Sequence, residues 1–241
     1  MYKLKTALVS GASSEIGSAI CDSLSESYNV IALYRDKERY EKFCISSSYY
    51  YYSYCIHLDL EGSSEELFDW IKEKNIPYPT ILVNNAGINI NGLCEKFNQD
   101  SFTKILYTNL LGTFNLTKAV IPYMKKENWG RIVNISSITA TTGAYGASAY
   151  ASSKGAINSF TKSVAKEVGR HGITVNSISL GYTNTGMIKD VPDYVVSDIV
   201  THTPLNRLGR AEEVANVVEF LCSKKSSFIT GAVIPVTGGY A

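Results

Sequence analysis

Short apolar runs alternate with longer helical patterns along the whole chain. The apolar runs are rich in β-branched residues, which favour strands. Seven strands are predicted, at Thr6–Ser10, Asn29–Leu33, Ser53–His57, Thr80–Asn84, Arg131–Ile135, Ile173–Ser179 and Ala232–Val236. Helices are predicted at Glu15–Ser27, Ser63–Asn75, Gln99–Lys126, Tyr150–Arg170 and Ala211–Cys222. This alternation is typical of an α/β fold in which helices cover both faces of a doubly wound parallel sheet.

Two stretches show no clear pattern. Ser46–Tyr54 is rich in serine and tyrosine and is interpreted as a connection running into the third strand, in preference to a tyrosine-lined interface. Gly181–Arg210 has no clear element, and long irregular stretches in compact domains are usually substrate loops or lids. At 241 residues, the chain is expected to form a single domain around one large core.

Composition argues against several classes of partner. The 23 Lys and Arg residues against 22 Asp and Glu give a net charge of +1, which favours neither nucleic acid nor an anionic membrane. No apolar run reaches the roughly 18 residues of a membrane span, and no secretory leader is recognised. Five cysteines without CxxC spacing indicate free thiols, and three scattered histidines indicate no metal site. A cytoplasmic location is therefore expected.

A glycine-bearing turn, Ser10–Gly17, connects the first strand to the first helix. The free N–H groups and positive dipole end of a helix start suit a pyrophosphate. Gly11 permits a tight turn and Gly17 close packing of helix and sheet, so a Rossmann-type dinucleotide site is predicted. An ordinary strand-to-helix turn is the alternative for this motif taken alone. The expected contacts are Gly11, Ser13, Ser14, Ile16 and Gly17.

The residues at the end of the second strand indicate whether NADP(H) or NAD(H) is preferred. Arg35 follows Tyr34 there and can form charge-assisted hydrogen bonds with a 2′-phosphate, which favours NADP(H) over NAD(H). Asp36 is the alternative, because a carboxylate there can hold the ribose of NAD if the register differs by a residue or two.

Tyr150 and Lys154 are four residues apart, so a helix places both on one face. An ammonium there is expected to lower the phenol pKa from about 10 towards neutrality, and such a phenol can exchange a proton with a carbonyl oxygen. Ser137 precedes Tyr150 by thirteen residues. Together with the dinucleotide turn, these residues predict a nicotinamide-dependent carbonyl reductase or alcohol dehydrogenase.

These motifs, and several others in the same order, resemble the short-chain dehydrogenase/reductase family and, within it, the 3-oxoacyl-(acyl-carrier-protein) reductase branch. The further motifs are Asn84–Gly87, Thr108–Leu110, Ile135–Ser137, Gly172–Asn176, Pro204–Gly209, Ile229–Gly231 and Thr237–Gly239. The resemblance implies that Tyr150 donates the proton, Ser137 polarises the carbonyl and Lys154 holds the nicotinamide ribose. It also implies that Asn109 positions a water linking Lys154 to solvent. Ser136 is the alternative to Ser137, which the spacing favours.

The resemblance also implies the remaining cofactor contacts. Asp59 and Leu60 resemble the pair at the adenine edge, and Asn85, Ala86 and Gly87 the wall beside the adenine ribose. Gly181 lies beside the nicotinamide in this comparison, and Thr183 and Thr185 meet its carboxamide. Asn84 is expected to tie strands together in the core.

Two positions depart from the family pattern. Glu15 replaces the middle glycine of the phosphate turn, so weaker pyrophosphate binding is expected from the carboxylate. Leu180 replaces a proline after the sixth strand, so a less pre-organised turn is expected beside the nicotinamide.

The predicted substrate is a small-molecule ketone, with a 3-oxoacyl thioester, free or bound to a carrier protein, as the leading candidate. A dehydrogenase of a sugar, polyol or other small secondary alcohol is the first alternative, and a cofactor-binding scaffold with weak catalysis is the second. Asn128 and His171 stand where carrier-docking reductases present basic residues, although Lys125, Lys126 and Arg131 lie nearby. The resemblance implies a homotetramer, with a dimer as alternative.

Overall fold

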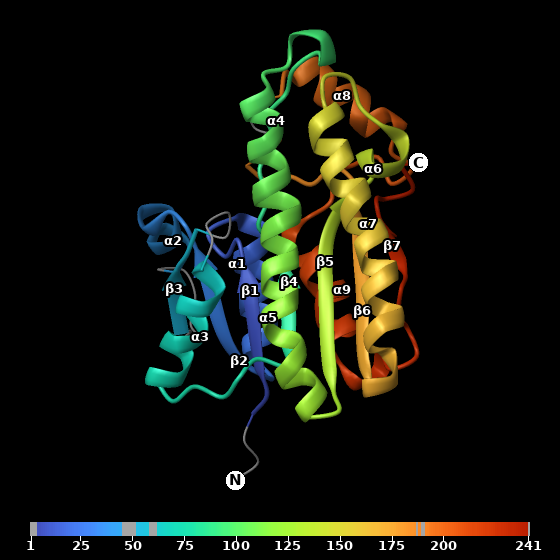
Figure 1. Cartoon of the computed structure of the whole chain (residues 1–241). Coiled ribbons are helices and arrows are strands. Elements are labelled where there is room, and N and C mark those ends of the chain that lie inside the picture. The colour runs from blue at the N-terminus through green and yellow to red at the C-terminus, as the bar shows by residue number, and fades with distance from the viewer. Residues whose placement is uncertain (1–3, 45–51, 58–61, 187, 189–190, 241) are drawn as a thin grey trace.

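Seven parallel strands form one sheet, in the order β3-β2-β1-β4-β5-β6-β7 (Figure 1). The computed structural model describes residues 4–44, 52–57, 62–186, 188 and 191–240. The strands are β1 (Thr6–Ser10), β2 (Asn29–Tyr34), β3 (Tyr52–Cys55), β4 (Ile81–Asn84), β5 (Gly130–Ser137), β6 (Ile173–Leu180) and β7 (Val233–Val236). The predicted doubly wound Rossmann-type α/β fold is confirmed, and the strand bounds agree with the prediction to within two residues.

The helices and the sheet alternate along the chain, as predicted. The α-helices are α1 (Glu15–Ser25), α2 (Lys37–Cys44), α3 (Ser63–Glu73), α4 (Gln99–Leu106), α5 (Gly112–Lys126), α6 (Thr139–Thr142), α7 (Ser148–Val168), α8 (Asp193–His202) and α9 (Ala211–Cys222). Short 3₁₀ turns lie at Cys94–Lys96, Gly169–His171 and Lys224–Ser226.

Three helices were not predicted, and each gives a weak sequence signal for its own reason. The helix α2 consists largely of charged residues, and α6 is only one turn long. The helix α8 lies inside Gly181–Arg210, so the prediction of no clear element there was wrong. It is a short helix between Pro192 and Pro204, whose fixed φ angles favour irregular chain.

The predicted continuous helix over residues 99–126 is also corrected. It changes at Tyr107–Leu111 into a π-helix between α4 and α5. A π-helix leaves backbone groups out of the α-helical pattern and is frequent at functional sites. Residues 46–51 of the tyrosine-rich tract lie outside the described residues, whereas Tyr52–Cys55 forms the edge strand β3.

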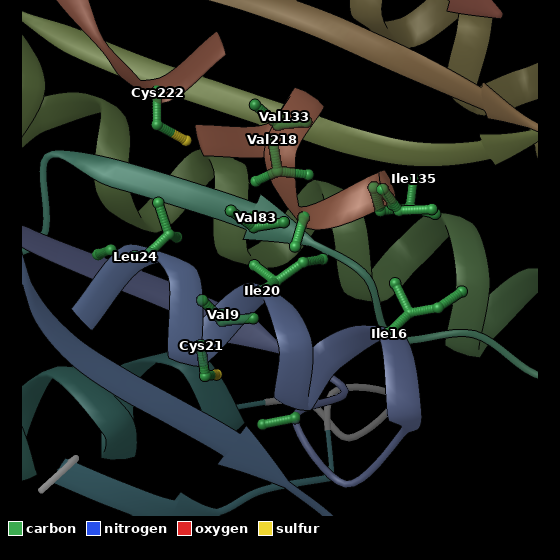
Figure 2. Close-up of a cluster of buried hydrophobic side chains, with 14 of the residues drawn as sticks. Val9, Ile16, Ile20, Cys21, Leu24, Val83, Val133, Ile135, Val218 and Cys222 are labelled. Carbon is green, nitrogen blue, oxygen red and sulfur yellow. The ribbon is translucent and has the colours of Figure 1, made fainter. Parts of the chain in front are cut away.

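The two faces of the sheet bury separate hydrophobic clusters. On one face, Ile20 and Leu24 of α1 pack with Val9 of β1 and Val218 of α9 (Figure 2). On the other, α3, α5 and α7 cover neighbouring positions such as Leu8 of β1. Adjacent residues of a strand point to opposite faces, so the alternation follows from the pleat. A parallel sheet covered by helices on both faces offers its strand ends for ligand binding.

Three further observations concern the described residues alone. Their helices include none that is both long and apolar enough to cross a membrane. They contain no group of His, Cys, Asp and Glu side chains able to hold a metal ion. Cys21, Cys55, Cys94 and Cys222 form no disulfide bond within this part of the chain.

Candidate active site

A cavity of about 640 Å³ opens at the carboxyl ends of the strands. It is lined by the turn after β1, the end of β2, the segments after β4 and β6, and the end of β5. The chain leaves β1 towards β2 on one side and returns to β4 on the other. Parallel α/β sheets bind their ligands at such a reversal of strand order.

Three of the predicted residues meet in this cavity. Ser137 is the last residue of β5, while Tyr150 and Lys154 lie in the first turns of α7. Ser137 and Lys154 are buried, at 8% and 3% exposure. The Lys154 Nζ donates to the Ile135 carbonyl at 2.7 Å and lies 5.6 Å from the centre of the Tyr150 ring.

Burial sets the protonation of this pair. Burial raises the pKa of Tyr150 to about 12, and a hydrogen bond with Ser137 acts in the opposite direction. Burial also lowers the pKa of Lys154 to about 8. The prediction that the phenol pKa falls towards neutrality was therefore wrong for this chain. The low-dielectric surroundings disfavour both charged forms.

Asn109 lies in the π-helix and is fully buried. Its side chain accepts from the Ile88 N–H at 2.8 Å and donates to the Ile88 carbonyl and the Ser153 hydroxyl, both at 3.0 Å. The side chain thus ties the segment after β4 to α7. A Cβ on Gly87 would lie 3.4 Å from both Asn109 Oδ1 and Lys154 Nζ, so the glycine keeps the space between them open.

The phosphate turn has the geometry that its glycines predicted. Gly11 has φ of +68°, and a Cβ there would lie 2.8 Å from Ala86 Cα. A Cβ on Gly17 would lie 2.2 Å from the Gly11 carbonyl oxygen. Ser14 caps α1 by accepting from Gly17 N at 3.0 Å. Ser13, Ser14 and Ile16 line the cavity with Gly11.

Asn85 braces this turn from the neighbouring segment. Its amide donates to the Ser10 and Gly11 carbonyls at 3.1 and 3.0 Å and to Ser14 Oγ at 3.2 Å. Asn85, Ala86 and Gly87 all line the cavity. Asn84 instead lies in the core, where it donates to Thr117 and Asn134 and ties β4 to β5 and α5.

Both candidate readers of the adenine ribose reach the cavity. Arg35 and Asp36 are exposed and line it directly after β2. Their backbone is held by a bond from Tyr40 N to the Asp36 carbonyl at 3.0 Å and by Cys55 Sγ, which donates to the Arg35 carbonyl at 3.6 Å. The two rings of Tyr34 and Tyr40 stack 4.3 Å apart.

The departure at Leu180 leaves a well-held turn. Leu180 pairs with Ser137 in the sheet, and its carbonyl accepts from Ile138 N at 2.8 Å. Gly181 N donates to the Val236 carbonyl at 2.9 Å. The Leu180 carbonyl is thus tied to the start of α6, and the Gly181 N–H is tied to β7. Gly181, Thr183 and Thr185 beyond it line the cavity.

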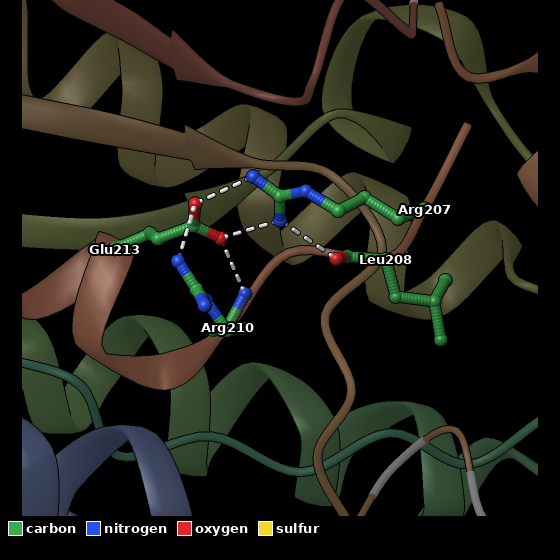
Figure 3. A network of polar contacts seen from close by, with 4 residues as sticks. All are labelled: Arg207, Leu208, Arg210 and Glu213. Carbon is green, nitrogen blue, oxygen red and sulfur yellow. Dashed lines mark hydrogen bonds and ion pairs between the residues drawn. The ribbon is translucent and has the colours of Figure 1, made fainter. Parts of the chain in front are cut away.

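A polar network stabilises the segment that carries Thr183 and Thr185. Thr183 pairs with Gly209 in an isolated parallel bridge. The loop leading from Gly209 is held by Glu213, whose carboxylate accepts from both terminal nitrogens of Arg207 at 2.7 and 2.8 Å and from Arg210 N at 2.8 Å (Figure 3). These hydrogen bonds lower the pKa of Glu213 to about 2.

Sequence reasoning missed several lining residues. Thr108 was recognised as part of a motif and not as a contact, yet its buried Oγ1 has no partner among the described residues. Its position next to Asn109 was the available signal. Val191, Val195 and Ile199 at α8 gave no signal, since that helix was not predicted. Asp59 and Leu60, predicted at the adenine edge, lie outside the described residues.

These features fit a dinucleotide. The turn after β1 needs glycine where a Cβ would strike the backbone, and it presents the start of α1 to the cavity. The partnerless Thr108 hydroxyl supplies a further polar group for a bound molecule. Glu15 lies in the first turn of α1 and also lines a second pocket, beside Asp22 and Arg210. The fold and the cavity thus define the class as a dinucleotide-dependent oxidoreductase.

Comparison with known proteins identifies the family to which the chain belongs. The family model described as "Enoyl-(Acyl carrier protein) reductase" matches residues 11–241. The 3-oxoacyl-(acyl-carrier-protein) reductase of Pseudomonas aeruginosa is 40% identical over 167 residues, covering 69% of this chain and 68% of that protein. The acetoacetyl-CoA reductase of Cupriavidus necator is 35% identical, covering 98% of this chain and 97% of that protein.

A solved structure agrees with this relationship. A provisionally assigned gluconate dehydrogenase of Agrobacterium tumefaciens superposes with a TM-score of 0.89 at 27% identity, covering 98% of this chain and 95% of the other. The chain belongs to the short-chain dehydrogenase/reductase family, whose members use a nicotinamide dinucleotide. It is an oxidoreductase that acts on CH–OH groups and their carbonyl counterparts.

The buried lysine predicts a pH dependence of stability. Its pKa falls on folding from 10.5 to about 8, so between these values the unfolded chain binds more protons than the folded one. Stability contributed by Lys154 is therefore fully present above 10.5 and is lost as pH falls through 8. The unfolding free energies of wild type and Lys154→Met can be measured with urea at pH 8 and at pH 10. Relative to the variant, wild type should be more stable at pH 10 than at pH 8. A constant difference would contradict the assignment.

Proposed function

We propose that this protein reduces the ketone of a 3-oxoacyl thioester to a secondary alcohol with NADPH. The observation that carries the proposal is the apolar end of the cavity. Away from the dinucleotide turn, the cavity is lined by Ile88, Ala144, Ile188, Val195 and Ile199. Among the described residues, the charged side chains lining the cavity are Glu15, Arg35, Asp36 and Lys154. The first three of these belong to the dinucleotide end.

An apolar pocket end suits an acyl chain better than a sugar acid. A carboxylate ligand is normally held by an Arg or Lys, and the described residues at this end offer amides and hydroxyls, such as Asn89 and Tyr182, instead. The names of the curated relatives, a 3-oxoacyl-(acyl-carrier-protein) reductase and an acetoacetyl-CoA reductase, support the same substrate class. A dehydrogenase of a sugar or other small alcohol is the second candidate, supported by the structural neighbour.

The geometry supports a role for both Tyr150 and Ser137 in the reduction of a carbonyl group. Tyr150 has its pKa raised to about 12 and is therefore protonated at neutral pH, as a proton donor to a carbonyl oxygen must be. Ser137, beside it, donates a hydrogen bond to the same oxygen and stabilises the charge that develops there. The bound nicotinamide supplies the hydride. These roles require the full set of side chains, and its presence argues against a scaffold without turnover.

Lys154 and Asn109 complete the proposed proton path. With a pKa of about 8, Lys154 can lose and regain a proton near neutral pH and so restore the proton of Tyr150. Gly87 places no side chain between Lys154 Nζ and Asn109 Oδ1, and we propose that a water in this space links Lys154 to solvent. We assign Asn109 to holding this space open, because its side chain fastens Ile88 to Ser153 on α7.

A coenzyme A thioester or a carrier-bound thioester satisfies the apolar cavity equally. Of the basic residues expected near a carrier protein, Lys125 and Lys126 are exposed. Arg131 is only 3% exposed and donates to the carbonyls of Gly130, Gly172 and Ser223. It is therefore a structural residue, and the docking surface is less basic than the sequence alone indicated.

The substrate assignment is tested with acetoacetyl-CoA and NADPH. Wild type should oxidise NADPH in proportion to added acetoacetyl-CoA, whereas Tyr150→Phe should lower kcat by about 10²- to 10⁴-fold because the proton donor is gone. NADPH affinity, measured by calorimetry, should change little. Faster turnover of gluconate with NAD(P)⁺ than of acetoacetyl-CoA with NADPH would favour the second candidate.

The cofactor preference is tested at Arg35. Charge-assisted hydrogen bonds to the 2′-phosphate are worth about 1.5–3 kcal/mol, so Arg35→Ala should weaken NADPH binding roughly tenfold to 150-fold. NADH binding should be nearly unchanged. Asp36→Ala, at the neighbouring exposed position, is the matched control and should not weaken NADPH binding. Loss of NADH binding in Asp36→Ala, with wild type preferring NADH, would reverse the assignment.

We also propose that the protein forms a homotetramer. Exposed aromatic side chains occur on three consecutive helical segments, Phe102 on α4, Tyr107 in the π-helix and Phe114 on α5, and Phe114 packs on Phe160 of α7. Light scattering should give four times the chain mass of 26.4 kDa, and Phe102→Glu with Phe114→Glu should lower it. A wild-type dimer would correct the stoichiometry, and a wild-type monomer would contradict the proposal.

A further inference from the structure

Thr139 makes two hydrogen bonds to the predicted catalytic serine. It begins α6, two residues beyond Ser137, and lines the same cavity. Its backbone N–H donates to Ser137 Oγ at 3.2 Å, and its hydroxyl donates to the same atom at 3.0 Å. Neither bond was foreseen from the sequence, in which Thr139 is one of several threonines in Thr139–Thr142.

A serine hydroxyl has one hydrogen to donate and two lone pairs that accept. In this site Thr139 occupies both accepting positions of Ser137. The Ser137 hydrogen is therefore left to point towards a third group. The hydrogen bond between Ser137 and Tyr150 lowers the phenol pKa, which is the effect of a donor towards the phenol oxygen.

The surroundings hold Thr139 in place. Ile138 N donates to the Leu180 carbonyl at 2.8 Å, which fastens the start of α6 to the end of β6. The hydroxyls of Thr141 and Thr142 donate back to the Ile138 carbonyl at 2.9 and 3.2 Å. Thr139 is thus carried on a short, braced turn, and its two donors approach Ser137 from a fixed direction.

We propose that Thr139 is a positioning residue that fixes the Ser137 hydroxyl as a hydrogen-bond donor to the substrate carbonyl oxygen. A donor oriented before the reaction stabilises the developing charge without having to turn during the step. Without the Thr139 hydroxyl, the Ser137 O–H can rotate away from the substrate carbonyl oxygen. Ser137 Oγ can then also accept a hydrogen bond from a group on the substrate side. The inference rests on the proposed carbonyl reduction and assigns an orienting role to a residue outside the Ser-Tyr-Lys set.

The kinetic test compares Thr139→Val with Thr139→Ser. Valine has nearly the same shape and lacks the hydroxyl, so kcat with acetoacetyl-CoA and NADPH should fall about threefold to tenfold, the range of one neutral hydrogen bond. Serine restores the hydroxyl and should restore most of the rate. Thr201→Val removes an exposed hydroxyl that donates to the Ser197 carbonyl and does not line the cavity, so it should leave kcat unchanged. NADPH affinity should be the same in all of these variants.

A double-mutant cycle separates orientation from simple packing. In a Ser137→Ala background, Thr139→Val should have little further effect on the single-turnover rate, because the group that it orients is absent. An additional threefold to tenfold loss in that background would overturn the proposal, since Thr139 would then act independently of Ser137.

A second measurement needs no substrate. Replacing Tyr150 by 3,5-difluorotyrosine, a more acidic phenol, gives a ¹⁹F resonance whose pH titration reports the pKa of that side chain. If Thr139 holds Ser137 as a donor, Thr139→Val should raise this pKa, Thr139→Ser should return it, and the control Thr201→Val should leave it unchanged. An unchanged or lowered pKa in Thr139→Val would refute the inference. If wild type reduces no ketone, the proposed function fails, and the fluorine titration still decides the role of Thr139.

Discussion

The contact between β5 and α7 is the constraint on which the active site depends. The Ile135 carbonyl holds the Lys154 ammonium at 2.7 Å, and Ser136 Oγ donates to the Lys154 carbonyl at 3.1 Å. About two turns further along α7, the Thr161 hydroxyl oxygen accepts a hydrogen bond from the Asn134 side chain at 2.8 Å. These buried polar bonds fix how far along the strand the helix lies. They therefore set the distance between Ser137, at the strand end, and Tyr150, at the helix start.

The same contact explains why the two ionisable groups have shifted pKa values. A helix packed closely on a central strand leaves little water around Tyr150 and Lys154, and both are driven towards their neutral forms. A protonated phenol is the form that donates to a carbonyl. A lysine that titrates near neutral pH can exchange protons during turnover. Close packing of secondary structure thus sets the acid–base chemistry of this site.

The sequence predicted the strands, most helices and the residues that line the cavity better than it predicted the interactions between those residues. The glycines of the phosphate turn were identifiable because a tight turn and a close approach admit few other residues. The direction of the Tyr150 pKa shift was predicted wrongly, because helical spacing reports the nearness of Lys154 and says nothing about burial. The burial of Arg131 was not predictable for a related reason. Its side chain donates to the carbonyls of Gly172 and Ser223, which are distant in sequence.

By itself the sequence determined the order of strands and helices, the dinucleotide turn and the Ser137, Tyr150 and Lys154 set, because these follow from local periodicity, glycine positions and fixed spacing. The tertiary structure alone decided the burial of Tyr150 and Lys154, the helix α8 beside the cavity and the two bonds from Thr139 to Ser137. Burial depends on which elements pack together, and a short helix such as α8 has too few residues to show a clear pattern. Hydroxyl hydrogen bonds depend on angles and distances that only a packed backbone defines.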